Sequence, residues 1–149
     1  MVVSTVLNPE QIEASQAWVY RFYRLFDSLE VDQWIEEFYN PDSVVHFGNF
    51  PPMEGAEVLR AHFKRQNAQL LSMRHDLKHI DVFPDRIYVQ NEATFVVKND
   101  PERKEIKFPA VCLFWKNINE KKSSTIDVYL DPSPLLERLH MFSSQDRVE

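Results

Sequence analysis

The sequence predicts an α+β fold in which three N-terminal helices pack on a curved, mainly antiparallel sheet and enclose a pocket. Up to about residue 71, apolar residues recur mostly at helical spacing. After Ser72, apolar and polar residues alternate in four segments separated by short turns, which is typical of an antiparallel meander. A sheet of this kind has to bury one face, so we expect the helices to cover it.

Three helices and one short strand are expected in the first half: a helix from about Pro9 to Glu30, a second from Asp32, a strand at 43–47 and a third helix from Glu54–Gly55 onward. Asn8 suits the N-cap of the first helix, and Pro9 suits its first helical position. Asp32 is expected to cap the second helix. That helix ends at Asn40-Pro41-Asp42, because proline cannot continue a helix.

Four strands are predicted in the second half, at about 74–83, 86–98, 105–116 and 124–130. The alternation is irregular between His75 and Phe83. Because the chain has only two glycines to form tight bends, we expect a β-bulge there. A short turn or helix at 135–142 and a polar tail at 143–149 complete the chain.

Composition narrows the class of protein. The 149 residues are expected to form one domain, 1–149, with a core from about 9 to 140. A formal net charge of −6 without a large basic cluster argues against a nucleic-acid partner. No apolar run approaches the roughly 20 residues of a membrane span, and the N-terminus lacks the basic residues of a signal peptide. The single cysteine, Cys112, excludes an internal disulfide, so we expect a soluble cytoplasmic protein.

The last strand carries the most informative polar pattern. Asp127 and Tyr129 share one face with Asp131, whereas apolar residues occupy the other face. This polar face either meets solvent or a dimer partner, or lines a pocket, and we favour the pocket. There Asp127 could donate a proton, because apolar surroundings favour a protonated carboxyl, and Tyr129 could hydrogen-bond a substrate oxygen. Asp131 is a candidate substrate contact, although its place before Pro132 favours capping of the following turn.

Four segments, in this order, resemble the SnoaL-like polyketide cyclase family of the nuclear transport factor 2-like superfamily, which also holds ketosteroid isomerases. They are Phe26–Trp34, Val45–Gly55, Arg74–Leu77 and Val128–Leu135. The resemblance covers about residues 12 to 139 and implies a cone-shaped α+β barrel with a deep pocket. It also implies a homodimer, formed here through the sheet. Because members share a cavity rather than a reaction, the resemblance locates a site without naming its chemistry.

Two histidines are further candidates for proton transfer. His46 lies nine residues before Gly55, where it resembles in position, but not in identity, the general-base aspartate of ketosteroid isomerases. A histidine can shuttle protons near neutral pH, and the alternative is a core or surface histidine. His75 opens the strand after the third helix, where the family pattern often shows histidine. It is expected either to face the cavity or to bond the backbone at the sheet edge.

Other residues are candidates for substrate binding. Tyr23, Phe50 and Trp115 are expected to form an aromatic wall that suits a flat hydrophobic ligand, although core packing explains each of them alone. Glu92 interrupts a central strand, and its carboxylate needs either a salt bridge or a wet cavity. Asp27, on the first helix, can reach solvent or the mouth of the pocket.

Metal and nucleotide cofactors lack support in the sequence. His75 and His79 have the spacing of a zinc-binding helix, but on a strand they would lie ~13 Å apart. Gly-rich phosphate loops are absent. We therefore expect a cofactor-independent acid/base enzyme, a cyclase, isomerase or dehydratase. Its substrate would be a hydrophobic oxygenated small molecule, such as a polyketide or terpenoid intermediate of secondary metabolism. The alternative is a non-catalytic ligand-binding or dimerisation module of the same fold.

Overall fold

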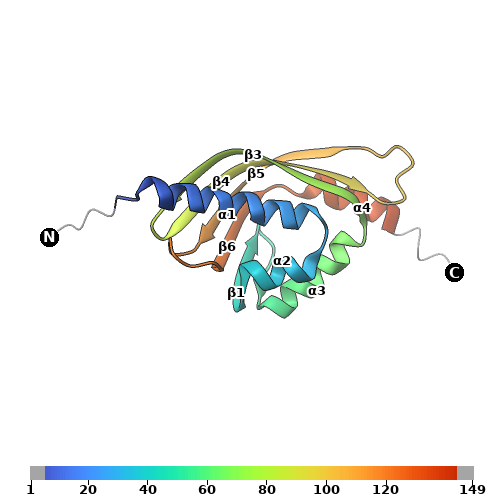
Figure 1. Cartoon of the computed structure of the whole chain (residues 1–149). Coiled ribbons are helices and arrows are strands. Elements are labelled where there is room, and N and C mark those ends of the chain that lie inside the picture. Colours follow the sequence, from blue (N-terminus) through green and yellow to red (C-terminus); the bar gives the residue numbers. More distant parts are fainter. Residues whose placement is uncertain (1–5, 144–149) are drawn as a thin grey trace.

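The computed structural model describes residues 6–143 and consists of a six-stranded sheet with four helices around it (Figure 1). The elements follow one another as α1 (Pro9–Asp27), α2 (Val31–Phe38), β1 (Tyr39–Phe47), β2 (Met53–Glu54), α3 (Ala56–Asn67), β3 (Leu70–Phe83), β4 (Arg86–Val97), β5 (Ile106–Trp115), β6 (Ser123–Leu130) and α4 (Ser133–Ser143). The predicted α+β class is confirmed. The predicted polar tail lies almost entirely outside the described residues.

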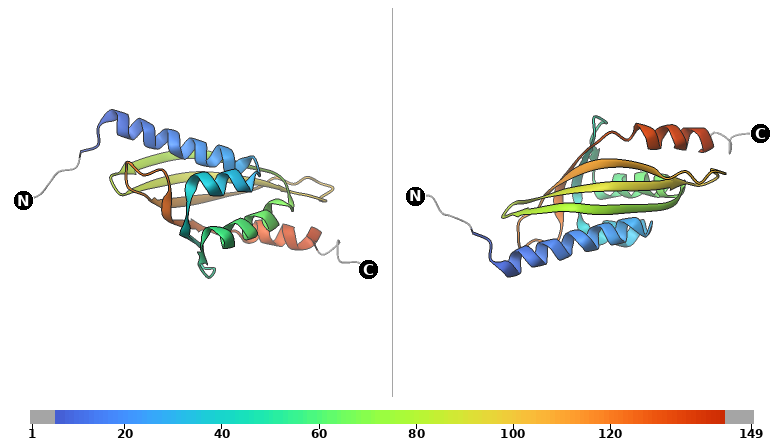
Figure 2. Two further views of the ribbon diagram at one scale, coloured as in Figure 1. Left: turned by 60° about the horizontal axis from the view of Figure 1, so that its bottom comes forward. Right: turned by 90° about the horizontal axis from the view of Figure 1, so that it is seen from above.

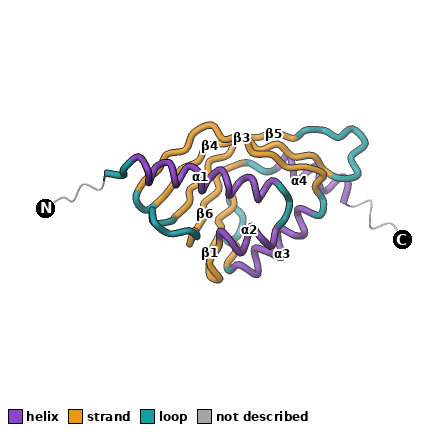
Figure 3. Tube along the Cα trace, in the orientation of Figure 1, coloured by secondary structure: helices purple, strands orange, loops and turns teal. Residues whose placement is uncertain are grey.

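The sheet has the strand order β2-β1-β6-β5-β4-β3 (Figure 3). Strands β3 to β6 form the predicted antiparallel meander. Strand β1 then joins β6 in parallel, and β2 pairs antiparallel with β1. The sheet curves around the helices without closing, so the predicted cone has an open side.

The helices surround the inner side of this curved sheet (Figure 2). Figure 2 shows α1 beside β3 and α4 on the β5 side of the sheet, while α2 and α3 lie near β1. Within the described residues, no helix combines the length and apolar character needed to span a membrane. This arrangement leaves an interior space bounded by helices and strands alike.

The first residues of α1 and α2 show how local side-chain contacts determine where a helix begins. The Asn8 side chain accepts from the Gln11 backbone N–H, the Gln11 side chain accepts from the Asn8 N–H, and Pro9 is the first helical residue, as predicted. Helix α2 instead begins at Val31, which corrects the prediction that Asp32 is its cap. The Asp32 carboxylate contacts Arg60 and Lys64 of α3, at 2.6 and 3.0 Å. Hydrogen bonds from Lys64 and then Arg60 lower the pKa of Asp32.

The strand irregularity predicted between His75 and Phe83 is confirmed. The register between β3 and β4 shifts between Leu77 and His79, which is the signature of a bulge. Strand β3 begins at Leu70, earlier than predicted, and its long paired length makes β3 and β4 the largest ladder of the sheet. His75 is paired opposite Ala93 near the start of this ladder.

Two hydrophobic clusters form the interior. Phe22 lies at the centre of the first, with ring contacts to residues of α1, α2, β1 and β5. The second joins Phe95 and Phe108, stacked at 5.4 Å, to Leu135 and Leu139 of α4. The candidate site lies where these clusters meet.

Candidate functional site

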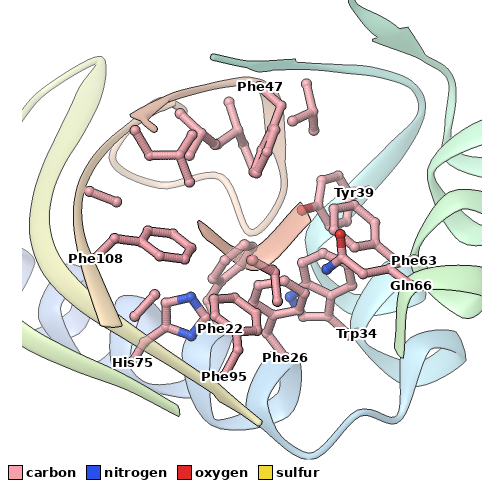
Figure 4. Close-up of a pocket in the computed structure, with 17 residues that line it drawn as sticks. Phe22, Phe26, Trp34, Tyr39, Phe47, Phe63, Gln66, His75, Phe95 and Phe108 are labelled. Atoms are coloured by element: carbon pink, nitrogen blue, oxygen red, sulfur yellow. The ribbon is translucent and has the colours of Figure 1, made fainter. Parts of the chain in front are cut away.

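An apolar cavity of about 70 Å³ lies between the two hydrophobic clusters (Figure 4). Residues of all four helices and of strands β1, β3, β4, β5 and β6 line it, and most of them are aromatic or aliphatic. Polar atoms come mainly from His75 on β3, Tyr39 at the start of β1 and Gln66 on α3. A mostly apolar cavity with few polar groups is typical of a small-molecule site.

His75 forms a close pair with Asp27, the last residue of α1. The Nδ1 atom of His75 lies 2.6 Å from Oδ1 of Asp27, and the backbone N–H of His75 donates to Oδ2 at 2.9 Å. The His75 side chain is only 8% exposed and that of Asp27 21%. A carboxylate only accepts hydrogen bonds, so Nδ1 carries the hydrogen and Nε2 is left as the basic nitrogen. We call this arrangement the Asp27–His75 pair.

Aromatic rings enclose the His75 imidazole. Phe26 stacks on it at 5.4 Å, Tyr23 lies at 5.0 Å and Phe95 meets it edge-on at 6.0 Å. Of the two placements expected for His75, the structure shows the one that faces the cavity. Its side chain bonds the Asp27 side chain and not the backbone at the sheet edge. Asp27, predicted only to reach solvent or a pocket mouth, provides the partner.

The Asp27–His75 pair also borders a second, open space. A surface groove of about 620 Å³ runs between α1 and β3, and its lining includes Tyr20, Arg24, Asp27 and His75. Asp27 does not line the apolar cavity, whereas His75 lines both the cavity and the groove. The pair therefore connects the apolar interior with a solvent-facing surface.

The hydroxyl of Tyr39 lies on the opposite side of the cavity from His75 (Figure 4). Burial raises the pKa of Tyr39 well above its usual value, so the phenol keeps its proton. Among the described residues, the Tyr39 hydroxyl has no hydrogen-bond partner. Trp34 Nε1, on the adjoining helix, is fully buried and has no hydrogen-bond partner within residues 6–143.

His46, Asp127 and Tyr129 lie on the outer face of the sheet, which corrects their predicted placement in the pocket. Alternate residues of β6, not these, line the cavity, namely Ile126, Val128 and Leu130. The cavity is apolar, so the apolar face of β6 turns inward and the polar face outward. Tyr129 is consequently 62% exposed.

His46 and Asp127 nevertheless form a pair of their own. His46 Nδ1 lies 2.8 Å from Asp127 Oδ1, and Trp115 Nε1 donates to Oδ2 at 2.9 Å. The His46 side chain is half exposed. Trp115 therefore supports this outer His46–Asp127 pair and does not line the cavity. The outer pair combines the same two side-chain types as the Asp27–His75 pair, but neither of its residues lines the apolar cavity.

The remaining predicted substrate contacts do not line the cavity. Tyr23 packs behind His75, where its hydroxyl accepts from Asn91 Nδ2 at 3.3 Å. Phe50 is 46% exposed beyond the end of β1. Glu92 lies on the face of β4 opposite the cavity-lining Ala93, and Asp131 accepts from the Ser133 N–H at the start of α4. Asp131 thus caps the turn, as its place before Pro132 indicated.

Other chemistry finds little support in the described part of the chain. Burial raises the pKa of the Cys112 thiol to about 11, so it is not a thiolate nucleophile at neutral pH. Within residues 6–143, no three histidine, cysteine or acidic side chains converge as metal ligands. The arrangement that remains is a buried histidine, oriented by a carboxylate, in the wall of an apolar cavity.

The chain contains a SnoaL-like domain. The family model for the SnoaL-like domain matches residues 19–121, and this chain belongs to that family. No curated protein matches the chain in sequence.

Solved structures share the fold at low sequence identity. A protein from Shewanella denitrificans OS-217 assigned to the SnoaL-like polyketide cyclases has a TM-score of 0.71 at 14% identity, covering 90% of this chain and 99% of its own. SalBIII, an epoxide hydrolase/cyclase-like enzyme of pyran ring formation in the polyether salinomycin, has a TM-score of 0.69 at 19% identity, with 83% and 95% covered. An epoxide hydrolase of the LEH-like type from M. tuberculosis has 0.67 at 13%, with 91% and 96% covered.

Proposed function

We propose that this protein is a cofactor-independent acid/base enzyme, a cyclase, isomerase or dehydratase, in which His75 transfers the proton. The observation that carries the proposal is the Asp27–His75 pair, with 2.6 Å between the two side chains, in the wall of the apolar cavity. The proposed substrate is a hydrophobic oxygenated small molecule such as a polyketide or terpenoid intermediate. The cytoplasmic location and the role in secondary metabolism stay predictions.

The chemistry follows from the geometry of the pair. Asp27 holds the Nδ1–H of His75, which orients the ring and stabilises the imidazolium that forms when Nε2 takes a proton. The proton comes from a C–H or O–H group of the substrate in the cavity. It then returns to another atom of the substrate, or leaves through Asp27 to the groove between α1 and β3.

The desolvation cost of the Asp27–His75 pair favours a functional role for it. Removing a carboxylate from water has a desolvation cost that apolar packing of the same volume would avoid. The Asp27–His75 pair is mostly buried beside aromatic rings, and its histidine adjoins the cavity. Electrostatic interactions with a developing charge are also stronger in such a site than in water.

Enzymes occur among the solved structures that share this fold, and this supports the proposal. They include SalBIII, an epoxide hydrolase/cyclase-like enzyme of pyran ring formation, and an LEH-like epoxide hydrolase. The second candidate, a non-catalytic module, is favoured by the small volume of the cavity, about 70 Å³. Against this candidate stands His75, a histidine in the wall of the apolar cavity that is held from behind by the Asp27 carboxylate.

The test compares two histidines of the same chain. Proton abstraction is measured by NMR as deuterium incorporation next to the carbonyl of ketones and lactones in D₂O, which requires no knowledge of the natural product. We expect His75→Gln to reduce catalysed exchange by at least a hundredfold, in line with the usual contribution of a general base. His46→Gln, which removes the histidine of the outer His46–Asp127 pair, is the matched control and should exchange like the parent protein.

Two outcomes would contradict the proposal. One is exchange by the parent protein no faster than buffer for every compound that binds. The other is equal loss in both variants, because only His75 adjoins the cavity. Folding of each variant is checked by its unfolding temperature.

A further inference from the structure

We propose that a groove between the start of α2 and the end of α3 is a second binding site, and that its ligand is a small carboxylate that also carries a hydroxyl group. This α2–α3 groove has a volume of about 520 Å³ and shares no lining residue with the apolar cavity. Its polar and charged side chains are those of Glu30, Asp32, Lys64, Asn67 and Lys98. The inference does not depend on the proposed function, because His75 has no part in this groove.

The side-chain amide of Asn67, the last residue of α3, is buried without a partner. Asn67 is 7% exposed and lines the α2–α3 groove, and neither its Oδ1 nor its Nδ2 atom has a hydrogen-bond partner within residues 6–143. Buried amides are normally hydrogen-bonded, because an unsatisfied polar group carries a desolvation cost. A ligand that both accepts and donates hydrogen bonds would satisfy both atoms.

The start of α2 lines the same groove and provides hydrogen-bond donors. The first backbone N–H groups of a helix have no partner within the helix. In the described part of the chain no side chain caps those of α2, whereas Asn8 caps α1. Val31 and Asp32, the first two residues of α2, line the groove. Free N–H groups and the helix dipole together favour an anionic oxygen at this position.

The charged side chains limit the charge of the ligand. Lys98 directly follows β4, and its backbone N–H donates to the Gln69 carbonyl at 2.9 Å, which holds it beside the end of α3. Its ammonium group has no acidic partner among the described residues. Lys64 contacts Asp32 at 3.0 Å. Because Glu30 and Asp32 also line the groove and would repel a dianion, a single carboxylate fits better than a doubly charged phosphate.

The amide and the donors together select the class of ligand. The carboxylate would accept hydrogen bonds from the start of α2, from Lys98 and from Asn67 Nδ2. A hydroxyl group on the neighbouring carbon would donate to Asn67 Oδ1. Glycolate is the smallest compound with both groups. Acetate has the same charge but no donor, so it would leave Oδ1 unsatisfied.

The experiment titrates the full chain with glycolate and with acetate at constant ionic strength, and follows the ¹H–¹⁵N resonances by NMR. The parent protein should bind glycolate saturably, with the largest shifts at Val31, Asp32 and the side-chain NH₂ of Asn67. Acetate should bind about fivefold more weakly, because one hydrogen bond is missing. The N–H groups at the start of α1, which Asn8 caps, are the internal control and should not shift.

Three variants assign the binding to particular side chains. Asn67→Ala should lose the preference for glycolate over acetate, and it should fold normally because the amide has no partner in the described part of the protein. Lys98→Gln should weaken both ligands several-fold, and Glu30→Gln should strengthen both because it removes a like charge. Lys107→Gln is the matched control for Lys98→Gln, since Lys107 does not line the groove.

Three outcomes would overturn the inference. They are shifts that do not saturate, equal affinity of the parent protein for glycolate and acetate, and a preference for glycolate that survives in Asn67→Ala. Deuterium exchange at the cavity is a separate measurement on a different site. Failure of the exchange test therefore leaves this inference standing, and failure of the glycolate titration leaves the proposed function standing.

Discussion

Two buried tyrosines, Tyr23 and Tyr39, differ in the hydrogen bonding of their hydroxyl groups. Tyr23 and Tyr39 are both 4% exposed, and burial raises the pKa of both well above the usual value. The Tyr23 hydroxyl is paired with Asn91, whereas that of Tyr39 faces the cavity unpaired. A polar group that faces a cavity and has no partner in the described part of the protein is a candidate for ligand binding.

This contrast predicts different effects on stability. Tyr23→Phe should lower the free energy of unfolding by about 1 kcal/mol, because it leaves the Asn91 amide without this partner. Tyr39→Phe should leave the free energy of unfolding nearly unchanged, since within residues 6–143 it removes no hydrogen bond of the protein. Urea unfolding of both variants measures the difference. Equal destabilisation by the two substitutions would mean that the Tyr39 hydroxyl has a protein partner in solution.

Single residues also show what the sequence could not predict. The period-two pattern of β6 predicts that Asp127 and Tyr129 share a face, but not which face turns toward the cavity. That choice depends on the curvature of the sheet and on the parallel pairing with β1, far away in the chain. The Asp27–His75 pair likewise joins residues separated by 48 positions, so no local spacing indicates it. His75 was identified as a candidate because of its residue type and its place in the family pattern.

At the scale of elements, α4 closes one end of the cavity and is fixed by a buried ion pair. Leu135 of α4 lines the cavity, and Arg138 binds both carboxylate oxygens of Asp100, at 2.8 and 2.9 Å, in the turn between β4 and β5. Two backbone N–H groups, those of Glu102 and Lys104, also donate to Asp100. The sequence predicted a short helix here but not this anchor, because Asp100 and Arg138 are 38 positions apart.

The Asp100 anchor predicts a pH dependence. Hydrogen bonds from Arg138, followed by the backbone N–H groups of Lys104 and Glu102, lower the pKa of Asp100 to about 2, from its usual value of 3.8. The ionised form is therefore favoured in the folded state, and its stabilising effect is present above about pH 4 and lost as the pH falls toward 2. Arg138→Met should lower the unfolding temperature at pH 7, and its difference from the parent protein should shrink between pH 4 and 2. A difference that is constant over this range would contradict the account.

Some features of other elements can be predicted from the residues next to them in the sequence. The start of α1 is fixed by Asn8, Gln11 and Pro9, whose capping chemistry acts within a few residues. The bulge in β3 was visible as broken alternation. The start of α2 was misassigned, because Asp32 binds α3 rather than its own helix terminus, and such a tertiary contact leaves no local signal.

At the scale of the whole molecule, the outer face of the sheet is a candidate interface between two copies of the chain. Tyr88 on β4, Val111 on β5 and Tyr129 on β6 are exposed, and Val111 and Tyr129 are direct neighbours in the sheet. Exposed apolar residues gathered on one face often mark an interaction surface. We therefore propose a homodimer through this face, as the resemblance to the family implied.

The dimer proposal is tested by mass measurement in solution. The parent protein should have the mass of two chains in size-exclusion chromatography with light scattering, and Tyr129→Glu should shift it toward one chain, because a buried carboxylate at the interface is costly. Lys107→Glu, a charge change on the same strand as Val111 but at its far end, is the control. A parent protein that is monomeric at all concentrations would contradict the proposal.

The central claim is that Asp27 and His75 act as one unit on a substrate in the cavity, and a double-mutant cycle tests it most directly. Deuterium exchange into a bound ketone is compared for Asp27→Asn, His75→Gln and the double variant. Residues that act as a unit are strongly non-additive, so the double variant should be no slower than His75→Gln alone. Multiplied losses in the double variant, or full activity in Asp27→Asn, would show that the pair does not carry out the proton transfer.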